Sequence, residues 1–125
     1  MDLRARLLWF DGSAGLVVGA AMVLLRGWLA ELYGLPQDLL LFMGVVNLLY
    51  GLNSSSLAAR SLRPQKLIVV LVVANLMWAL VCLVLAVSYG ADASVLGLLH
   101  LLVEGVFVGG LGCLEWRWRG LLATA

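Results

Sequence analysis

The chain has 125 residues, of which 64% are hydrophobic and only 12% are charged, and its mean hydropathy is +1.08. A soluble globular domain carries about 25% charged residues, so this composition excludes that class and indicates a membrane protein with one domain, residues 1–125. The formal net charge of +1 gives no reason to expect a nucleic-acid partner, which would require a strongly basic surface.

Four apolar runs each approach the ~20 residues that a helix needs to cross the hydrocarbon layer of a bilayer. We expect spanning helices near residues 7–25, 39–59, 67–88 and 94–114. Glycine, proline and charged residues separate these runs, as expected where a chain leaves the apolar layer. The connection between the last two runs, which contains "YGAD", is very short, so these runs must be antiparallel neighbours. The predicted fold is all-α: a polytopic up-and-down bundle of four transmembrane helices.

The first apolar run is also compatible with a secretory signal peptide, because basic residues precede it and small residues occur within it. However, the run is long, contains Asp11 and is followed by three further spans. We therefore expect it to remain in the mature protein. The segment that follows, "GWLAELYGLP", is expected to lie flat at the membrane surface.

The basic residues predict the orientation of the chain. Seven of the eight lysines and arginines lie before the first run, between the second and third, or after the fourth, and only Arg26 lies elsewhere. Short cytoplasmic loops carry the excess of lysine and arginine. Both termini are therefore expected in the cytoplasm.

Polar side chains from three runs are expected at similar depth, because a helix rises 1.5 Å per residue. Residues three or four apart share a helix face, so these side chains form stripes that can converge near the membrane midplane. The sequence therefore predicts a ligand-binding site composed of Glu104, His100, Asn47, Asn75, Trp78 and Tyr50.

Glu104 carries the strongest functional signal. An ionised carboxylate at the centre of a bilayer costs at least ~2.5 kcal/mol unless it is paired or neutral. His100 lies one helical turn away, and Trp78, Asn47 and Asn75 can donate hydrogen bonds. A carboxylate removed from water also tends to hold its proton, which suits Glu104 to proton relay or cation binding. For the asparagines, the alternative is that they only hold helices together.

Asp11 is interpreted differently, because it lies nearer the cytoplasmic end of its run. We expect it to be solvated or to pair with Arg60.

Glycines predict close helix contacts. Gly105, Gly109 and Gly112 lie on the side of the fourth run opposite Glu104, and Gly15 and Gly19 form a GxxxG pattern in the first. Such small faces let helix backbones approach each other. We expect a homo-oligomer or a membrane-protein partner, with tight packing inside one bundle as the alternative.

Enzyme and cofactor motifs are absent from the sequence. There is no GxSxG, phosphate loop, HExxH or CxxC, and a single histidine cannot provide both axial ligands of a haem. Cys82 and Cys113 lie in different runs and are expected to be core residues. We therefore expect no enzymatic activity, no cofactor and no metal; an enzyme acting on a lipid has only the pair of His100 and Glu104 in its favour.

The pattern "FDGSAGLVVGAAMVLL", "LYGLP", "LLFMGVVNLLYGL", "ANLMWALVCLVLA" and "LEWRWR" resembles a family of small uncharacterised four-helix integral membrane proteins of bacteria. The resemblance covers nearly the whole chain. It implies a location in the bacterial inner membrane and the four-helix architecture, and it implies no activity.

Two hypotheses about function follow from the sequence. In the first, the protein binds or transports a small apolar or cationic molecule, or an ion, at the midplane site with Glu104 as its titratable group. In the second, it is an accessory or scaffold protein that docks a membrane partner through its polar and glycine-rich helix faces. Membrane lipids are expected around the protein in either case.

Overall fold

The computed structural model describes residues 3–60 and 63–122, with side chains described for 6–60 and 63–120. The described residues form six helices: α1 (Leu3–Leu24), α2 (Arg26–Tyr33), α3 (Gln37–Ala59), α4 (Gln65–Tyr89), α5 (Val95–Arg117) and α6 (Arg119–Leu122). Four of them, α1, α3, α4 and α5, are long and apolar enough to cross a membrane. Their positions confirm the predicted all-helical fold and its four long segments.

The helix boundaries follow local sequence signals. Gly34 ends α2 in the left-handed conformation, with a φ of 66°, which glycine adopts without steric cost. Pro36 and Pro64 immediately precede α3 and α4, where proline's fixed φ suits a helix start. Ser94 caps α5, because its hydroxyl oxygen accepts a hydrogen bond from the Gly97 N–H.

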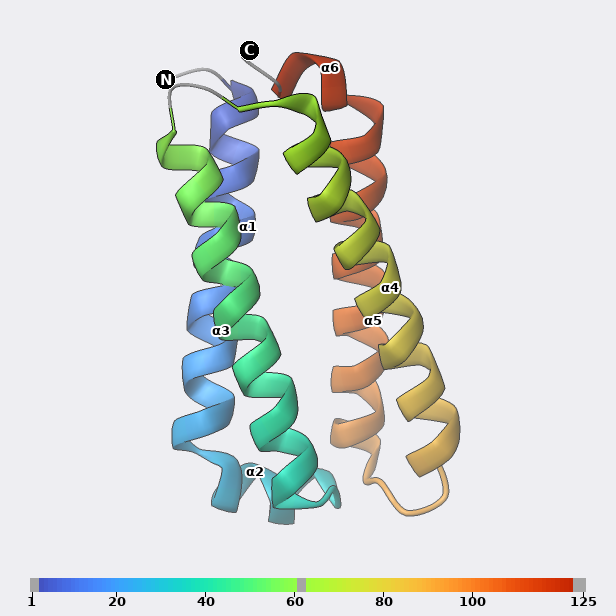
Figure 1. The fold of residues 1–125 in the computed structure, drawn as a ribbon. Helices are drawn as coiled ribbons and strands as arrows, with labels where there is room; N and C mark the ends of the chain where they lie inside the picture. Colours follow the sequence, from blue (N-terminus) through green and yellow to red (C-terminus); the bar gives the residue numbers. More distant parts are fainter. Residues whose placement is uncertain (1–2, 61–62, 123–125) are drawn as a thin grey trace.

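The four long helices form two antiparallel hairpins that stand side by side (Figure 1). The first hairpin pairs α1 with α3, and the second pairs α4 with α5, which confirms that the last two segments are antiparallel neighbours. The short helix α2 lies at the end of the bundle that also holds the α4–α5 turn, called here the α2 end. Helix α6 and the start of α1 lie at the opposite end, called here the terminal end.

Glycines bring α1 and α3 together. A Cβ atom at Gly51 would lie 2.6 Å from the Leu16 nitrogen and 2.7 Å from the Gly12 oxygen, and one at Gly19 would lie 2.7 Å from the Gly44 oxygen. These neighbours are backbone atoms, which cannot move aside as a side chain can. The glycine pattern of the first segment therefore serves contact within the chain.

The glycines of α5 pack in the same way against α4. A Cβ atom at Gly112 would lie 3.1 Å from the Asn75 Cβ, and one at Gly105 would lie 3.3 Å from the Cys82 Cβ. The structure thus accounts for these glycines within one chain. The homo-oligomer stays a prediction, but these contacts do not require a second copy.

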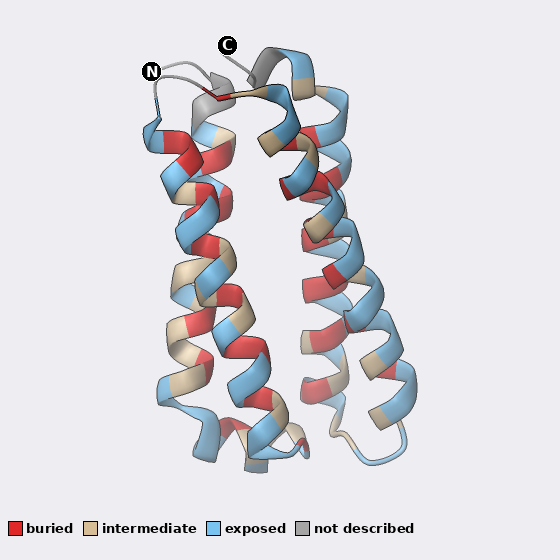
Figure 2. Ribbon diagram, viewed as in Figure 1, coloured by how far each residue is buried: buried red, intermediate tan, exposed pale blue. Residues whose placement is uncertain are grey.

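Two apolar clusters fill the bundle, one towards each end. The cluster towards the α2 end contains Met22, Leu29, Leu35, Leu40, Met43, Trp78, Cys82, Ala86, Leu101 and Val108. The cluster towards the terminal end contains Leu8, Leu57, Ala58, Ile68 and Leu71. Exposed residues cover the outside of the helices (Figure 2), and many of them are large and apolar, as a lipid-facing surface requires.

Candidate functional site

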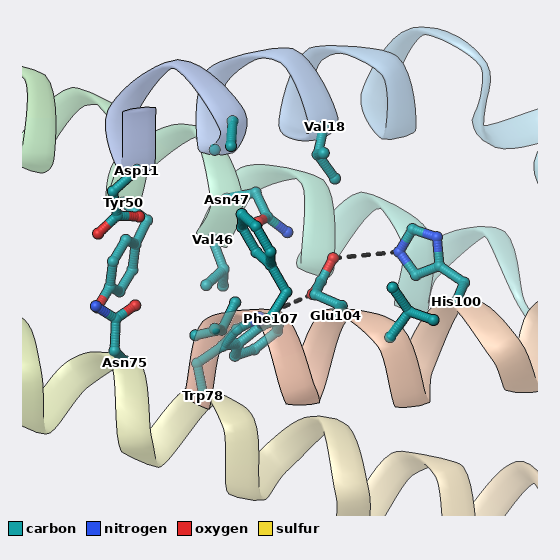
Figure 3. A pocket seen from close by; sticks show the side chains of 14 residues that line it. Asp11, Val18, Val46, Asn47, Tyr50, Asn75, Trp78, His100, Glu104 and Phe107 are labelled. Carbon is teal, nitrogen blue, oxygen red and sulfur yellow. Dashed lines mark hydrogen bonds and ion pairs between the residues drawn. The ribbon is translucent and has the colours of Figure 1, made fainter. Parts of the chain in front are cut away.

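A pocket of about 280 Å³ lies between the two hairpins (Figure 3). Residues from all four long helices line it. Its lining includes all six residues predicted from the sequence: Asn47, Tyr50, Asn75, Trp78, His100 and Glu104. The fold therefore brings together side chains from α3, α4 and α5 that the sequence placed only at similar depth.

Glu104 is buried and has a donor for each of its carboxylate oxygens. The Trp78 indole N–H donates to Oε2 at 2.8 Å, with the Cys82 thiol 3.5 Å from the same oxygen. The His100 Nε2 lies 3.2 Å from Oε1. The carboxylate therefore has the partners that its position required, with the indole as its shortest contact (Figure 3).

The chain of hydrogen bonds continues from His100 to Tyr33. The Tyr33 hydroxyl oxygen lies 3.0 Å from the His100 Nδ1. An ionised carboxylate can only accept hydrogen bonds, so a neutral His100 donates from Nε2 and accepts the Tyr33 hydroxyl at Nδ1. A continuous path thus runs from α2 through His100 to Glu104 in the pocket.

The position of Tyr33 depends on contacts between α2 and the start of α5. The Ser94 hydroxyl donates to the Leu32 oxygen at 2.7 Å, and the Ser94 N–H donates to the Tyr33 oxygen at 2.7 Å. A Cβ atom at Gly97 would lie 2.9 Å from the Tyr33 Cβ. Burial, and to a smaller extent the negative charge of Glu104, raises the pKa of Tyr33.

Aromatic pairs narrow both sides of the gap between the hairpins. Phe42 on α3 contacts Trp78 on α4 at a ring distance of 5.9 Å, and Phe10 on α1 contacts Phe107 on α5 at 5.8 Å. Two wall residues of the pocket on α5 are nevertheless exposed, Val103 by 63% and Phe107 by 39%. The pocket therefore reaches the lateral surface of the bundle on the α5 side.

The asparagines are not hydrogen-bonded to Glu104 in the described structure, although the sequence made them candidates for that role. Asn47 donates to the Met43 oxygen of its own helix at 2.8 Å, and Asn75 donates to Glu115. The Tyr50 hydroxyl donates to the Leu71 oxygen at 2.8 Å and so links α3 to α4. These three residues shape the pocket wall, while Trp78 and His100 hold the carboxylate.

The expectation for Asp11 is wrong. Its side chain is only 5% exposed, it lines the pocket, and its polar contacts are Glu115, Asn75 and Ser54 rather than Arg60. The reason is helix rotation: the glycine face of α1 packs on α3, and Asp11 is thereby turned into the gap between the hairpins.

Glu115 is the polar residue that the sequence analysis missed. It is 0% exposed, although it lies between Leu114 and Trp116 in the segment "LEWRWR", which contributed only to the family resemblance. Its spacing offered a signal, because Glu104, Val108, Leu111 and Glu115 follow each other at steps of three or four residues, which is one face of a helix.

No group of three or more histidine, cysteine, aspartate or glutamate side chains suited to a metal ion occurs within the described residues.

In comparisons with known proteins, no family model, no curated protein and no solved structure matches the chain. Its function must therefore be inferred from its own residues.

Proposed function

We propose that this protein binds a small, mainly apolar cation in the pocket between the hairpins and transports it across the bacterial inner membrane, with both termini in the cytoplasm. The observation that carries this proposal is the buried carboxylate of Glu104 in the wall of an apolar pocket. Small-molecule sites are usually apolar pockets that contain a small number of polar groups.

The pocket walls favour an apolar ligand of modest size. Valine, alanine and aromatic side chains form most of the lining, and the volume of about 280 Å³ lies just below the range of roughly 300–1,000 Å³ for drug-sized ligands. The Trp78 ring adds a π face that attracts cations. Apolar clusters lie towards both ends of the bundle, so a ligand from the lipid reaches the pocket most directly past Val103 and Phe107.

The hydrogen-bonded path from Tyr33 supplies a means of release. An ionised Glu104 has a negative charge that a cationic ligand can neutralise. A proton delivered to the pair of Glu104 and His100 neutralises that charge instead, because the two side chains are 3.2 Å apart. Ligand and proton therefore compete for Glu104, and we expect ligand affinity to fall as the pH is lowered.

The proposal is tested with tetraphenylphosphonium, an apolar monovalent cation, and purified protein in lipid nanodiscs. Glu104→Gln keeps the shape of the side chain and removes its charge. We expect this variant to bind the probe at least about tenfold more weakly, equivalent to about 1.4 kcal/mol. Equilibrium dialysis measures both affinities.

Glu31→Gln is the matched control, because Glu31 is an exposed carboxylate on α2 and its removal leaves the pocket unchanged. Equal affinities of the wild type and Glu104→Gln would show that Glu104 is not the cation partner. Native mass spectrometry of gently extracted wild-type protein detects small molecules that remain bound, without the choice of a probe. A wild type that binds no probe and retains no small molecule would overturn the proposal.

The second hypothesis, docking of a membrane partner, relied on polar and on glycine-rich helix faces, and the glycine-rich faces no longer favour it. The glycines named in the sequence, Gly15 and Gly19 of α1 and Gly105, Gly109 and Gly112 of α5, lie against α3 and α4 of the same chain. These five glycines therefore do not offer a free face to a partner. We therefore propose ligand binding, and a partner protein retained in the mass spectrum in place of a small molecule would restore the docking hypothesis.

A further inference from the structure

A second acidic cluster lies between the pocket and the terminal end. Asp11 on α1 is within hydrogen-bonding reach of Glu115 on α5, Asn75 on α4 and Ser54 on α3. Glu115 has Asp11 and Asn75 as its polar contacts, and the Asn75 amide donates to its Oε1. All four long helices thus contribute one side chain to the cluster.

The cluster contains oxygen atoms that lack a partner. Asp11 Oδ2, Glu115 Oε2, Ser54 Oγ and Asn75 Oδ1 are buried and have no hydrogen bond, and the four residues are between 0% and 5% exposed. Two ionised carboxylates can only accept hydrogen bonds, so neither can satisfy the other. A buried polar atom without a hydrogen-bond partner destabilises the folded protein. The oxygens of this cluster therefore need an additional hydrogen-bond donor.

We propose that Asp11 and Glu115 form a binding site for one exchangeable proton, separate from Glu104. A proton on either carboxyl turns the pair into a donor and an acceptor, so that a hydrogen bond can join Asp11 to Glu115. Neighbouring carboxylates commonly share one proton in this way, because two negative charges so close cannot both be retained away from water.

The surroundings fit a pair that carries one proton and one negative charge. Asn75 donates to Glu115, and the Ser54 hydroxyl lies within reach of Asp11. Among the described residues, Tyr50 on α3 is a further titratable group close enough to the pair to feel the charge of both carboxyls. No basic side chain is among the described polar contacts of either carboxyl.

The site is connected to the pocket and shielded from the terminal end. Asp11, Tyr50 and Asn75 line the pocket (Figure 3), whereas the cluster of Leu8, Leu57, Ala58, Ile68 and Leu71 lies on the terminal side. Proton exchange therefore takes place through the pocket. If Glu104 binds a ligand as proposed, the proton on this pair is suited to be the coupling ion, but the site itself does not depend on that role.

Infrared difference spectroscopy of the protein in nanodiscs tests the proposal, since a protonated carboxylic acid has its own C=O band that shifts in deuterium oxide. We expect such a band in the wild type near neutral pH. It should be lost in Asp11→Asn and in Glu115→Gln, where an amide N–H replaces the shared proton. Glu104→Gln is the matched control and should keep the band.

Circular dichroism shows whether each variant keeps its helices. Isotope labelling of all aspartates or all glutamates in the wild type assigns the band without any substitution. A wild type with no acid band, or a band that moves with neither label, would overturn the proposal. A carboxylate band that instead responds to sodium would also overturn it and would identify a metal cation. Failure of tetraphenylphosphonium binding leaves this result unaffected.

Discussion

At the scale of single residues, the polar contacts form two separate groups along the axis of the bundle. Tyr33, His100, Glu104 and Trp78 are joined by hydrogen bonds on the side of the α2 end. Asp11 and Glu115 lie together on the side of the terminal end. The pocket lies between these groups and is lined by members of both, so titratable side chains occur along most of the path between the hairpins.

Tyr33 provides a titration that tests the first group. Burial and the charge of Glu104 raise its pKa, so we expect Tyr33 to lose its proton above the ordinary tyrosine value of about 10. The ultraviolet titration of the wild type minus that of Tyr33→Phe isolates this transition. Glu104→Gln should lower the Tyr33 pKa without restoring it to the ordinary value, because burial remains.

The raised pKa of Tyr33 also makes the stability of the folded protein depend on pH. The unfolded chain releases the Tyr33 proton at lower pH than the folded protein does. Ionisation of Tyr33 therefore lowers the free energy of unfolding as the pH rises from about 10 towards the raised pKa of the folded protein. Glu31→Gln, on the exposed face of α2, should leave the transition unchanged. A Tyr33 transition in Glu104→Gln at the same pH as in the wild type would contradict the electrostatic effect of Glu104 on Tyr33.

At the scale of helices, close packing within each hairpin contrasts with the gap between hairpins. Glycines let α1 approach α3 and let α5 approach α4. The hairpins instead meet through side chains, in two apolar clusters and in a few aromatic and polar contacts, and leave a pocket between them. The two hairpins are therefore the rigid units of the molecule, and any movement that opens the pocket is expected between them.

Gly51→Ala tests the packing of the first hairpin. The added Cβ would meet backbone atoms of α1 at 2.6 and 2.7 Å, so we expect a loss of about 1–3 kcal/mol in the free energy of unfolding, as for other overpacked sites. Unfolding in mixed detergent, followed by circular dichroism, measures the change.

Gly110→Ala is the matched control, because a Cβ at Gly110 meets nothing within 4 Å. Alanine is a better helix former than glycine by up to about 1 kcal/mol, so this variant should be neutral or slightly more stable. Equal stability losses in both variants would mean that contact with α1 does not decide the effect.

At the scale of the whole molecule, charge is distributed unequally between the two ends. Six basic residues of the described part of the chain lie at the terminal end, near the start of α1, between α3 and α4, or at the end of α5 and in α6: Arg6, Arg60, Arg63, Lys66, Arg117 and Arg119. Arg26 lies at the α2 end. The bias of basic residues towards the cytoplasm therefore predicts that the terminal end faces the cytoplasm.

Reporter fusions in a bacterial host test this orientation. A fluorescent protein fused to the C-terminus should fluoresce, because it folds in the cytoplasm, and alkaline phosphatase at the same position should be inactive. Fusions after Asp92 in the α4–α5 turn should give the opposite pattern. Active phosphatase at the C-terminus would reverse the predicted topology.

The sequence by itself determined the element type, the four long segments and which polar residues of α3, α4 and α5 lie at a similar height along the bundle. Segment length and hydropathy report on these properties directly, because a helix has a fixed rise per residue and the apolar layer a limited thickness. For the same reason Glu104, His100 and Trp78 could be proposed as neighbours before their contacts were known.

Only the tertiary structure decided how each helix is rotated about its axis. Apolar residues surround every span, so periodicity does not distinguish a lipid-facing side from an inward one, and packing sets the rotation. Packing of glycines on α3 turned Asp11 inward, and the face of α5 that holds Glu104 also carries Glu115 into the same gap. Asp11 and Glu115, which are far apart in the sequence, therefore lie together, because helix rotation depends on contacts between helices.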